Sequence, residues 1–159
     1  MKKILTTMVL GLAQWMASTP ALAHDVNEHQ IARVLKQQFD RPDAKLIVDP
    51  VVIEGNVAVA SWQQAGRGGR AFLEKHHDQW SIVLCAGAGL KEADVLQSIG
   101  LSAEVATRLA HAVQEADREM DADERQRFDS FEGVIKVDGA NHGNPHAHHP
   151  TPTSPTQNP

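Results

Sequence analysis

The sequence is poor in sulfur ligands. Only one of its 159 residues, Cys85, is a cysteine, which excludes an internal disulfide and zinc or iron–sulfur sites built from four cysteines. Three of the four methionines lie in residues 1–23. If that segment is removed, only Met120 remains, and one chain then cannot build a thioether-rich Cu(I) site.

Basic side chains are also scarce. The chain has 15 Lys and Arg residues against 20 Asp and Glu residues. Two lysines lie in residues 1–23, so residues 24–159 contain 13 basic and 20 acidic side chains, a net charge of −7. Because nucleic acids and anionic membrane surfaces are bound by basic patches, both are poor candidates as partners. The remaining length corresponds to one domain.

Residues 1–23 have the pattern of an export signal. Two lysines form a basic start, residues 4–17 are mostly apolar, and a small-x-small cleavage site ends at Ala23. The apolar run is too short and too interrupted by polar residues to cross a bilayer. We therefore expect a signal peptide over 1–23, cleavage after Ala23, and a periplasmic mature protein that begins at His24 and has no membrane span.

The next segment has the period of a helix. Apolar residues at positions 31, 34, 35 and 39 lie on one helical stripe. Asn27 followed by Gln30 resembles a capping box, which predicts that the helix begins there. Pro42 disfavours helix in the residue before it and predicts the end of the helix.

The middle of the chain has the pattern of a β-meander. Pro50, in the first of its strands, predicts an edge strand or a bulge. The glycine-rich link at 65–69 is expected to be a flexible loop, with an anion-binding nest as the weaker alternative. Short links between successive strands indicate antiparallel pairing rather than βαβ units. The expected strands cover residues 46–53, 57–63, 70–75 and 80–85.

After residue 89 the period becomes helical again. A short helix is predicted at 91–99, and Ser102 and Asp121 are predicted to cap two further helices. Residues 134–137 are expected to extend along the edge of the domain. The fold class is therefore α+β: an N-terminal helix, an antiparallel β-meander of about four strands, and C-terminal helices at one side or end. The same order suits a curved cone of the cystatin or nuclear-transport-factor type, by fold analogy alone.

The composition changes at Asp138. Residues 140–159 contain five prolines, four histidines and no large apolar side chain. Such a segment buries too little apolar surface to offset the entropy lost on ordering its backbone. We expect a single α+β domain over 24–137 and a disordered His- and Pro-rich tail over 138–159.

Six stretches of the chain are distinctive in combination: FDRPD (39–43), VDPVVIEG (48–55), AVASW (58–62), GGRA (68–71), WSIVLC (80–85) and FDSFEG (128–133). They are similar to stretches in a family of small exported proteobacterial proteins, the copper-uptake-system-associated proteins. The resemblance covers residues 30–137 roughly. It implies a place in copper handling, with a periplasmic copper chaperone or a copper transport component as partner, and it supplies no active site and no ligand set.

His24 is the first candidate metal ligand. After cleavage at Ala23, its α-amine and its imidazole would bind one metal ion in a chelate ring, and nitrogen ligands favour Cu(II). An α-amine has a pKa of about 7.7–8.0, so its deprotonation near neutral pH costs little free energy. Asp25 and His29 are candidate third ligands. The alternative interpretation is a histidine that follows the signal by chance.

The tail supplies a second candidate site. A His-rich tract in a flexible chain predicts metal binding from its composition alone. Without a fixed geometry it distinguishes Cu(II) from Zn(II) or Ni(II) only by their intrinsic order of affinity. The alternative is a polar tail in which metal binding has no role. The histidines concerned are His142, His146, His148 and His149.

Three other candidates have simpler explanations. His76 and His77 are adjacent on a predicted strand and would point to opposite faces, so we expect a solvated hairpin end. His111 with Glu115 is expected to be a surface pair on a helix. Cys85 follows an apolar run and is expected to be a buried small hydrophobe, with a Cu(I) thiolate as the alternative.

Two function classes follow. No nucleophile elbow, zinc-protease motif or dinucleotide fingerprint occurs in the sequence, so we do not expect an enzyme. The first class is a periplasmic accessory of copper uptake that binds or buffers copper through histidines. The second is a non-enzymatic interaction module that assists a copper chaperone or transporter, with metal binding incidental. They differ in whether copper binding depends on His24 and the tail.

Overall fold

The computed structural model describes residues 20–137, with side chains from residue 24 onward. The predicted signal peptide, up to residue 19, and the predicted tail lie outside the described residues. The α+β fold is confirmed. The elements are α1 (Pro20–Phe39), β1 (Ile47–Glu54), β2 (Val57–Gln64), β3 (Arg67–His76), β4 (Gln79–Ala86), the 3₁₀ helix η1 (Ala88–Lys91), α2 (Ala93–Ser98), α3 (Ala103–Glu119), α4 (Ala122–Asp129) and β5 (Ile135–Lys136).

The strands form one antiparallel sheet in sequential order from β1 to β5. The fifth strand lies in the segment that was expected to extend along the domain edge. Pro50 lies in β1, which is an edge strand with an irregular register between Val48 and Val51, as predicted. No helix in the described part of the chain is both long enough and apolar enough to cross a bilayer.

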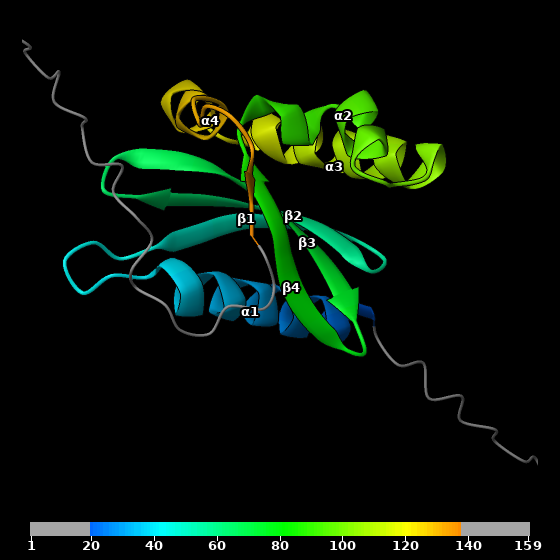
Figure 1. Cartoon of the computed structure of the whole chain (residues 1–159), viewed down its shortest axis with the longest axis horizontal. Helices are drawn as coiled ribbons and strands as arrows, with labels where there is room; N and C mark the ends of the chain where they lie inside the picture. The colour runs from blue at the N-terminus through cyan, green and yellow to red at the C-terminus, as the bar shows by residue number, and fades with distance from the viewer. Residues whose placement is uncertain (1–19, 138–159) are drawn as a thin grey trace, which may run out of the picture.

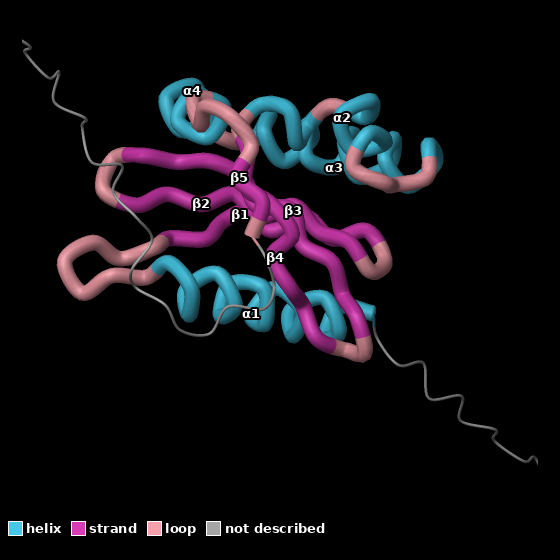
Figure 2. The backbone as a smooth tube through the Cα atoms, in the orientation of Figure 1, coloured by secondary structure: helices cyan, strands magenta, loops and turns pink. Residues whose placement is uncertain are grey.

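The sheet lies between two layers of helices. Figure 1 shows α1 on one face and α2, α3 and α4 on the other, and Figure 2 shows the same three layers. Side chains alternate along each strand, so neighbouring residues serve different cores. On β2, Val57 and Val59 belong to the apolar cluster beneath α2 and α3, whereas Ala58 and Ala60 belong to the cluster beneath α1.

The α1 helix packs on the sheet through Ile31 and Leu35, which are fully buried. It begins at Pro20, so the capping box predicted at Asn27 is wrong. Asn27 lies inside the helix, where its Oδ1 accepts hydrogen bonds from Lys75 Nζ at 3.2 Å and Trp80 Nε1 at 3.1 Å. This residue therefore attaches α1 to the β3–β4 hairpin.

The C-terminal helices begin at the predicted caps. The Ser102 hydroxyl accepts from the Val105 amide at 3.4 Å, and Asp121 Oδ1 accepts from the Glu124 amide at 2.8 Å. The helix predicted at 91–99 is divided in two, because η1 ends at Lys91 and α2 begins only at Ala93.

The loop predicted at 65–69 is shorter than expected: only Ala65 and Gly66 form the turn, and β3 begins at Arg67 and includes Gly68 and Gly69. A Cβ on Gly68 would lie 3.0 Å from Phe128 Cδ1, and one on Gly69 would lie 3.0 Å from Phe131 Cδ2. The two glycines therefore allow aromatic rings to pack closely against the strand.

Candidate functional site

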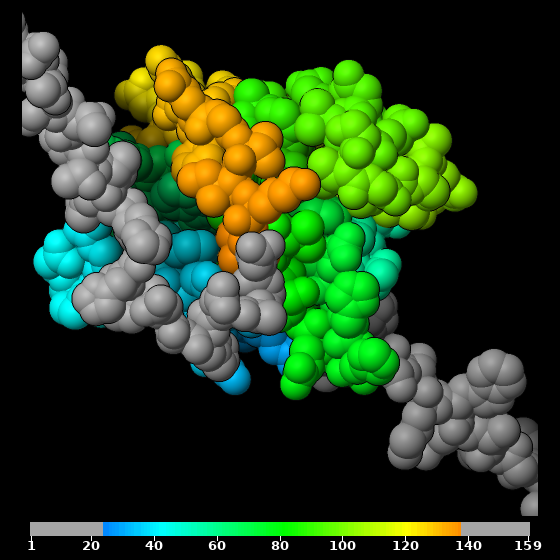
Figure 3. Space-filling model, viewed as in Figure 1, coloured from blue at the N-terminus to red at the C-terminus, as the bar shows by residue number. Residues whose placement is uncertain are grey.

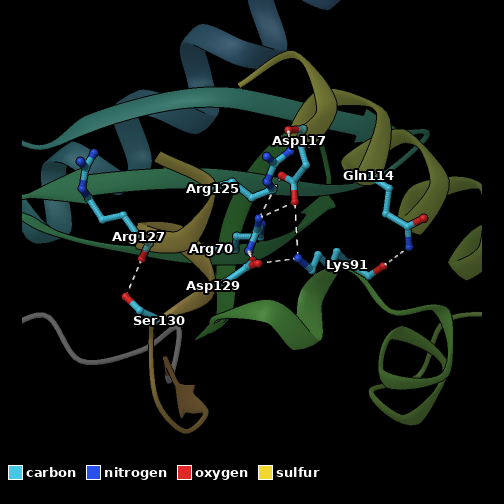
Figure 4. A network of polar contacts seen from close by, with 8 residues as sticks. All are labelled: Arg70, Lys91, Gln114, Asp117, Arg125, Arg127, Asp129 and Ser130. Carbon is cyan, nitrogen blue, oxygen red and sulfur yellow. Dashed lines mark hydrogen bonds and ion pairs between the residues drawn. The ribbon is translucent and has the colours of Figure 1, made fainter. Parts of the chain in front are cut away.

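Four charged side chains from four elements meet between the sheet and the C-terminal helices (Figure 4). They are Arg70 on β3, Lys91 on η1, Asp117 on α3 and Asp129 on α4, hereafter the charge cluster. Arg70 Nη2 donates to both carboxylate oxygens of Asp117, at 2.9 and 2.8 Å, and Nη1 donates to Asp129 Oδ1 at 2.6 Å. Lys91 Nζ donates to Asp129 Oδ2 at 2.5 Å.

The charge cluster is neutral and largely closed to solvent. Arg70 is 0% exposed and Asp117 is 4% exposed. Burial raises the pKa of Asp129, but hydrogen bonds and charges from Lys91 and Arg70 outweigh that effect, so its pKa lies below the ordinary value. Each of the two carboxylates is paired with a basic side chain. The arrangement therefore suits a role in holding β3, η1, α3 and α4 together.

Further contacts surround the charge cluster. Gln114 Nε2 donates to the Lys91 carbonyl and Arg125 Nη1 donates to the Asp117 carbonyl, both at 2.8 Å. The Arg70 guanidinium carbon also lies 5.9 Å from the centre of the Phe128 ring. These contacts fix the ends of η1 and α3, which carry two of the four charges.

The charge cluster was not predicted from the sequence, although the sequence contains a sign of it: charged residues at positions that belong to the core. Asp117 lies four residues after Val113, so it continues the buried stripe of α3 with a charged side chain. Arg70 stands among small and apolar residues of a central strand. A charged side chain at a core position needs a buried partner. An Arg and an Asp that both occupy core positions are therefore expected to form a pair.

His24 lies at the N-terminal end of the described side chains, on the first turns of α1. Its side chain is 52% exposed, and its Nδ1 lies 2.7 Å from Glu28 Oε1, one helical turn later. Glu28 was not among the predicted ligands, although the spacing of four residues places it on the same helical face.

The other predicted ligands near His24 do not converge on it. His29 is exposed and, at about 100° per residue, lies about 140° around the helix from His24. Asp25 is exposed on a further face. Among the residues that the structure describes, no three His, Cys, Asp or Glu side chains are grouped to hold a metal ion. The predicted ligands His142, His146, His148 and His149 lie outside these residues.

The three simpler explanations are confirmed. His76 is exposed with its Nε2 3.0 Å from Glu74 Oε2, and His77 is exposed in the β3–β4 turn. His111 Nε2 lies 3.4 Å from Glu115 Oε1 on the surface of α3. Cys85 is buried in the α1 side of the sheet, and burial raises the pKa of its thiol to about 11. At neutral pH it is therefore a protonated, apolar core residue.

No family model, no curated protein and no solved structure matches this chain. The resemblance to the copper-uptake-system-associated proteins thus stays a prediction from the sequence. The structure adds the α+β fold and the contacts of His24 and Arg70.

Proposed function

We propose that this protein is an exported, non-enzymatic accessory of copper uptake that binds or buffers Cu(II), with the ion as its cargo. The mature N-terminus at His24 is the chelating site, and the tail histidines are further ligands. One observation carries the proposal. The residue that processing would make N-terminal has an exposed imidazole whose Nδ1 lies 2.7 Å from a carboxylate of the next helical turn.

The chemistry of the terminus supports this role. The α-amine and Nδ1 of one histidine close a six-membered ring with a bound metal, so Nδ1 is the ring nitrogen that a chelate uses. Glu28 stands beside that nitrogen and replaces Asp25 and His29 as the third ligand that we propose. Removal of residues 20–23 would also place the amine at the positive end of the α1 dipole, which disfavours its protonation and eases metal binding.

The second candidate function is supported by the distribution of charge. Residues 92–132, which include α2, α3 and α4, contain eleven acidic and four basic side chains, a net charge of −7. Residues 24–91 contain eight of each. The C-terminal helical layer therefore suits contact with a basic surface of a chaperone or transporter, through electrostatic complementarity.

Export and copper binding are tested on one preparation. Protein recovered from the periplasm should have the intact mass of a chain that begins at His24. With one equivalent of Cu(II), its complex should show nitrogen hyperfine coupling by electron paramagnetic resonance, and that pattern should change in His24→Ala and stay the same in His111→Ala, an exposed histidine elsewhere. A periplasmic chain that begins at Met1, or an unchanged spectrum in His24→Ala, would contradict the proposal.

A further inference from the structure

The first turns of α1 contain the proposed copper ligands but lie ahead of the part of the helix that packs on the sheet. His24 is exposed, and Ile31, the first fully buried side chain among those described in the helix, follows about two turns later. Signal cleavage would leave residues 24–27 as the first turn, whose amides have no partner within the helix. Such a helix end frays unless tertiary contacts hold it. The directions of the His24 and Glu28 side chains therefore depend on what attaches this turn to the sheet.

Asn27 supplies that attachment. Its Oδ1 accepts hydrogen bonds from Lys75 Nζ at 3.2 Å and from Trp80 Nε1 at 3.1 Å. The two donors are themselves held in place, because they are paired across β3 and β4, and Lys75 Nζ lies 5.9 Å from the centre of the Trp80 ring. The hairpin end beyond them, residues 76–79, is exposed, and its green atoms lie along the lower edge of the molecule in Figure 3. The contact with Asn27 therefore joins the first turn of α1 to a fixed part of the hairpin.

The position of Asn27 in the helix links this contact to the proposed ligands. At about 100° per residue, Glu28 lies about 40° around the helix from His24, and Asn27 lies about 60° from His24 on the other side. The Glu28 carboxylate is therefore next to His24 Nδ1, at 2.7 Å, while the Asn27 side chain faces the hairpin. Fraying or rotation of this turn would move Glu28 away from Nδ1, and the hydrogen bonds of Asn27 oppose both.

We infer that Asn27 is a positioning residue of the proposed copper site. Its contact with the β3–β4 hairpin holds the first turn of α1, so that Glu28 stays within reach of an ion bound by His24. The inference rests on the proposed function. The amine and imidazole of His24 form a chelate within one residue and do not need the helix, so the third ligand alone depends on the turn. Because such coupling is reciprocal, bound copper should in turn strengthen the attachment of the turn to the hairpin.

Calorimetric titration of the processed full chain with the first equivalent of Cu(II) tests this inference. Asn27→Ala removes the acceptor and should weaken copper binding by about threefold or more. Lys75→Met removes one donor and should also weaken binding, although the loss of a positive charge by itself would favour a bound cation. The matched control is Lys45→Met, which removes an exposed lysine beyond the other end of α1 and should bind copper as the parent does.

A double-mutant cycle separates positioning from a general effect on stability. If Asn27 acts through Glu28, Asn27→Ala should change copper affinity by less than about twofold in a Glu28→Gln background. Lys75→Met provides the same cycle if Asn27→Ala does not fold. Parent-like binding in these variants, or equal losses with and without Glu28, would overturn the inference and leave the proposed function standing. If the processed parent binds no copper, both are wrong.

Discussion

Arg70 on β3 and Asp117 on α3 form a buried ion pair, in which one guanidinium nitrogen donates to both carboxylate oxygens. The two hydrogen bonds from Nη2 measure 2.9 and 2.8 Å. A buried pair of this kind adds little net stability over an apolar pair of similar size, but removal of one partner leaves a buried charge uncompensated. The pair therefore determines the position of the C-terminal helices on the sheet.

The first prediction concerns this pair. Asp117→Ala should lower the free energy of unfolding by about 3–5 kcal/mol, because Asp129 alone would then face both Arg70 and Lys91 and one buried positive charge would be uncompensated. The control is Arg118→Ala, whose side chain is 65% exposed and pairs with Glu115 on the surface. This control should change stability by less than about 0.5 kcal/mol in chemical denaturation. Equal losses in the two variants would show that the charge cluster is not a point of attachment.

The second prediction concerns Asp129 and pH. Because Lys91 and Arg70 hold its pKa below the ordinary value, the stability that ionised Asp129 contributes is complete above the unfolded carboxyl pKa of about 3.9 and is lost as pH falls through the lower folded pKa. Lys91→Met should raise the pKa of Asp129 in a carboxyl NMR titration. Lys45→Met, which removes a partner of Asp40 instead, should leave it unchanged.

The third prediction uses two glycines near η1. A Cβ on Gly87 would lie 2.5 Å from the Phe131 carbonyl and 2.7 Å from the Asp129 carbonyl, both of them backbone atoms. Gly87→Ala should therefore cost about 1–3 kcal/mol or more. On Gly89 the nearest atom would be Val95 Cγ1 at 3.5 Å, an ordinary contact, so Gly89→Ala should unfold close to the parent midpoint. The reverse order of stability would contradict this packing.

The fourth prediction concerns the tail in the absence of metal. Residues 138–159 have no core-forming side chains, so their deletion should lower stability by less than about 1 kcal/mol. Thermal unfolding of the two metal-free chains measures the difference. A larger loss would show that the tail packs on the domain without copper.

The features that could be predicted from the sequence are local. The strands and the caps at Ser102 and Asp121 were predicted because alternation and capping depend on residues close in the chain. Asn27 fits the same local pattern of a helix cap. In the structure it lies within α1, and its side chain accepts hydrogen bonds from Lys75 and Trp80 instead. Helix formation from Pro20 onward overrides the cap.

The errors and omissions depend on distant residues. Gly68 and Gly69 have the local pattern of a loop. They lie in a strand because Phe128 and Phe131, which are distant in the sequence, pack against them. Arg70 and Asp117 are 47 positions apart, and no local pattern joins them. Glu28 could have been found, because a spacing of four residues on a helix already places it beside His24.

The most direct test of the account is a calorimetric Cu(II) titration of the processed protein against a variant with one methionine ahead of His24. The extra residue removes the amine chelate and leaves every side chain of the domain and the tail in place. We predict that the processed protein binds copper at least about tenfold more tightly than the methionine variant, a difference of about 1.4 kcal/mol or more. Equal affinities would contradict the account, because the mature N-terminus would then not be the copper site.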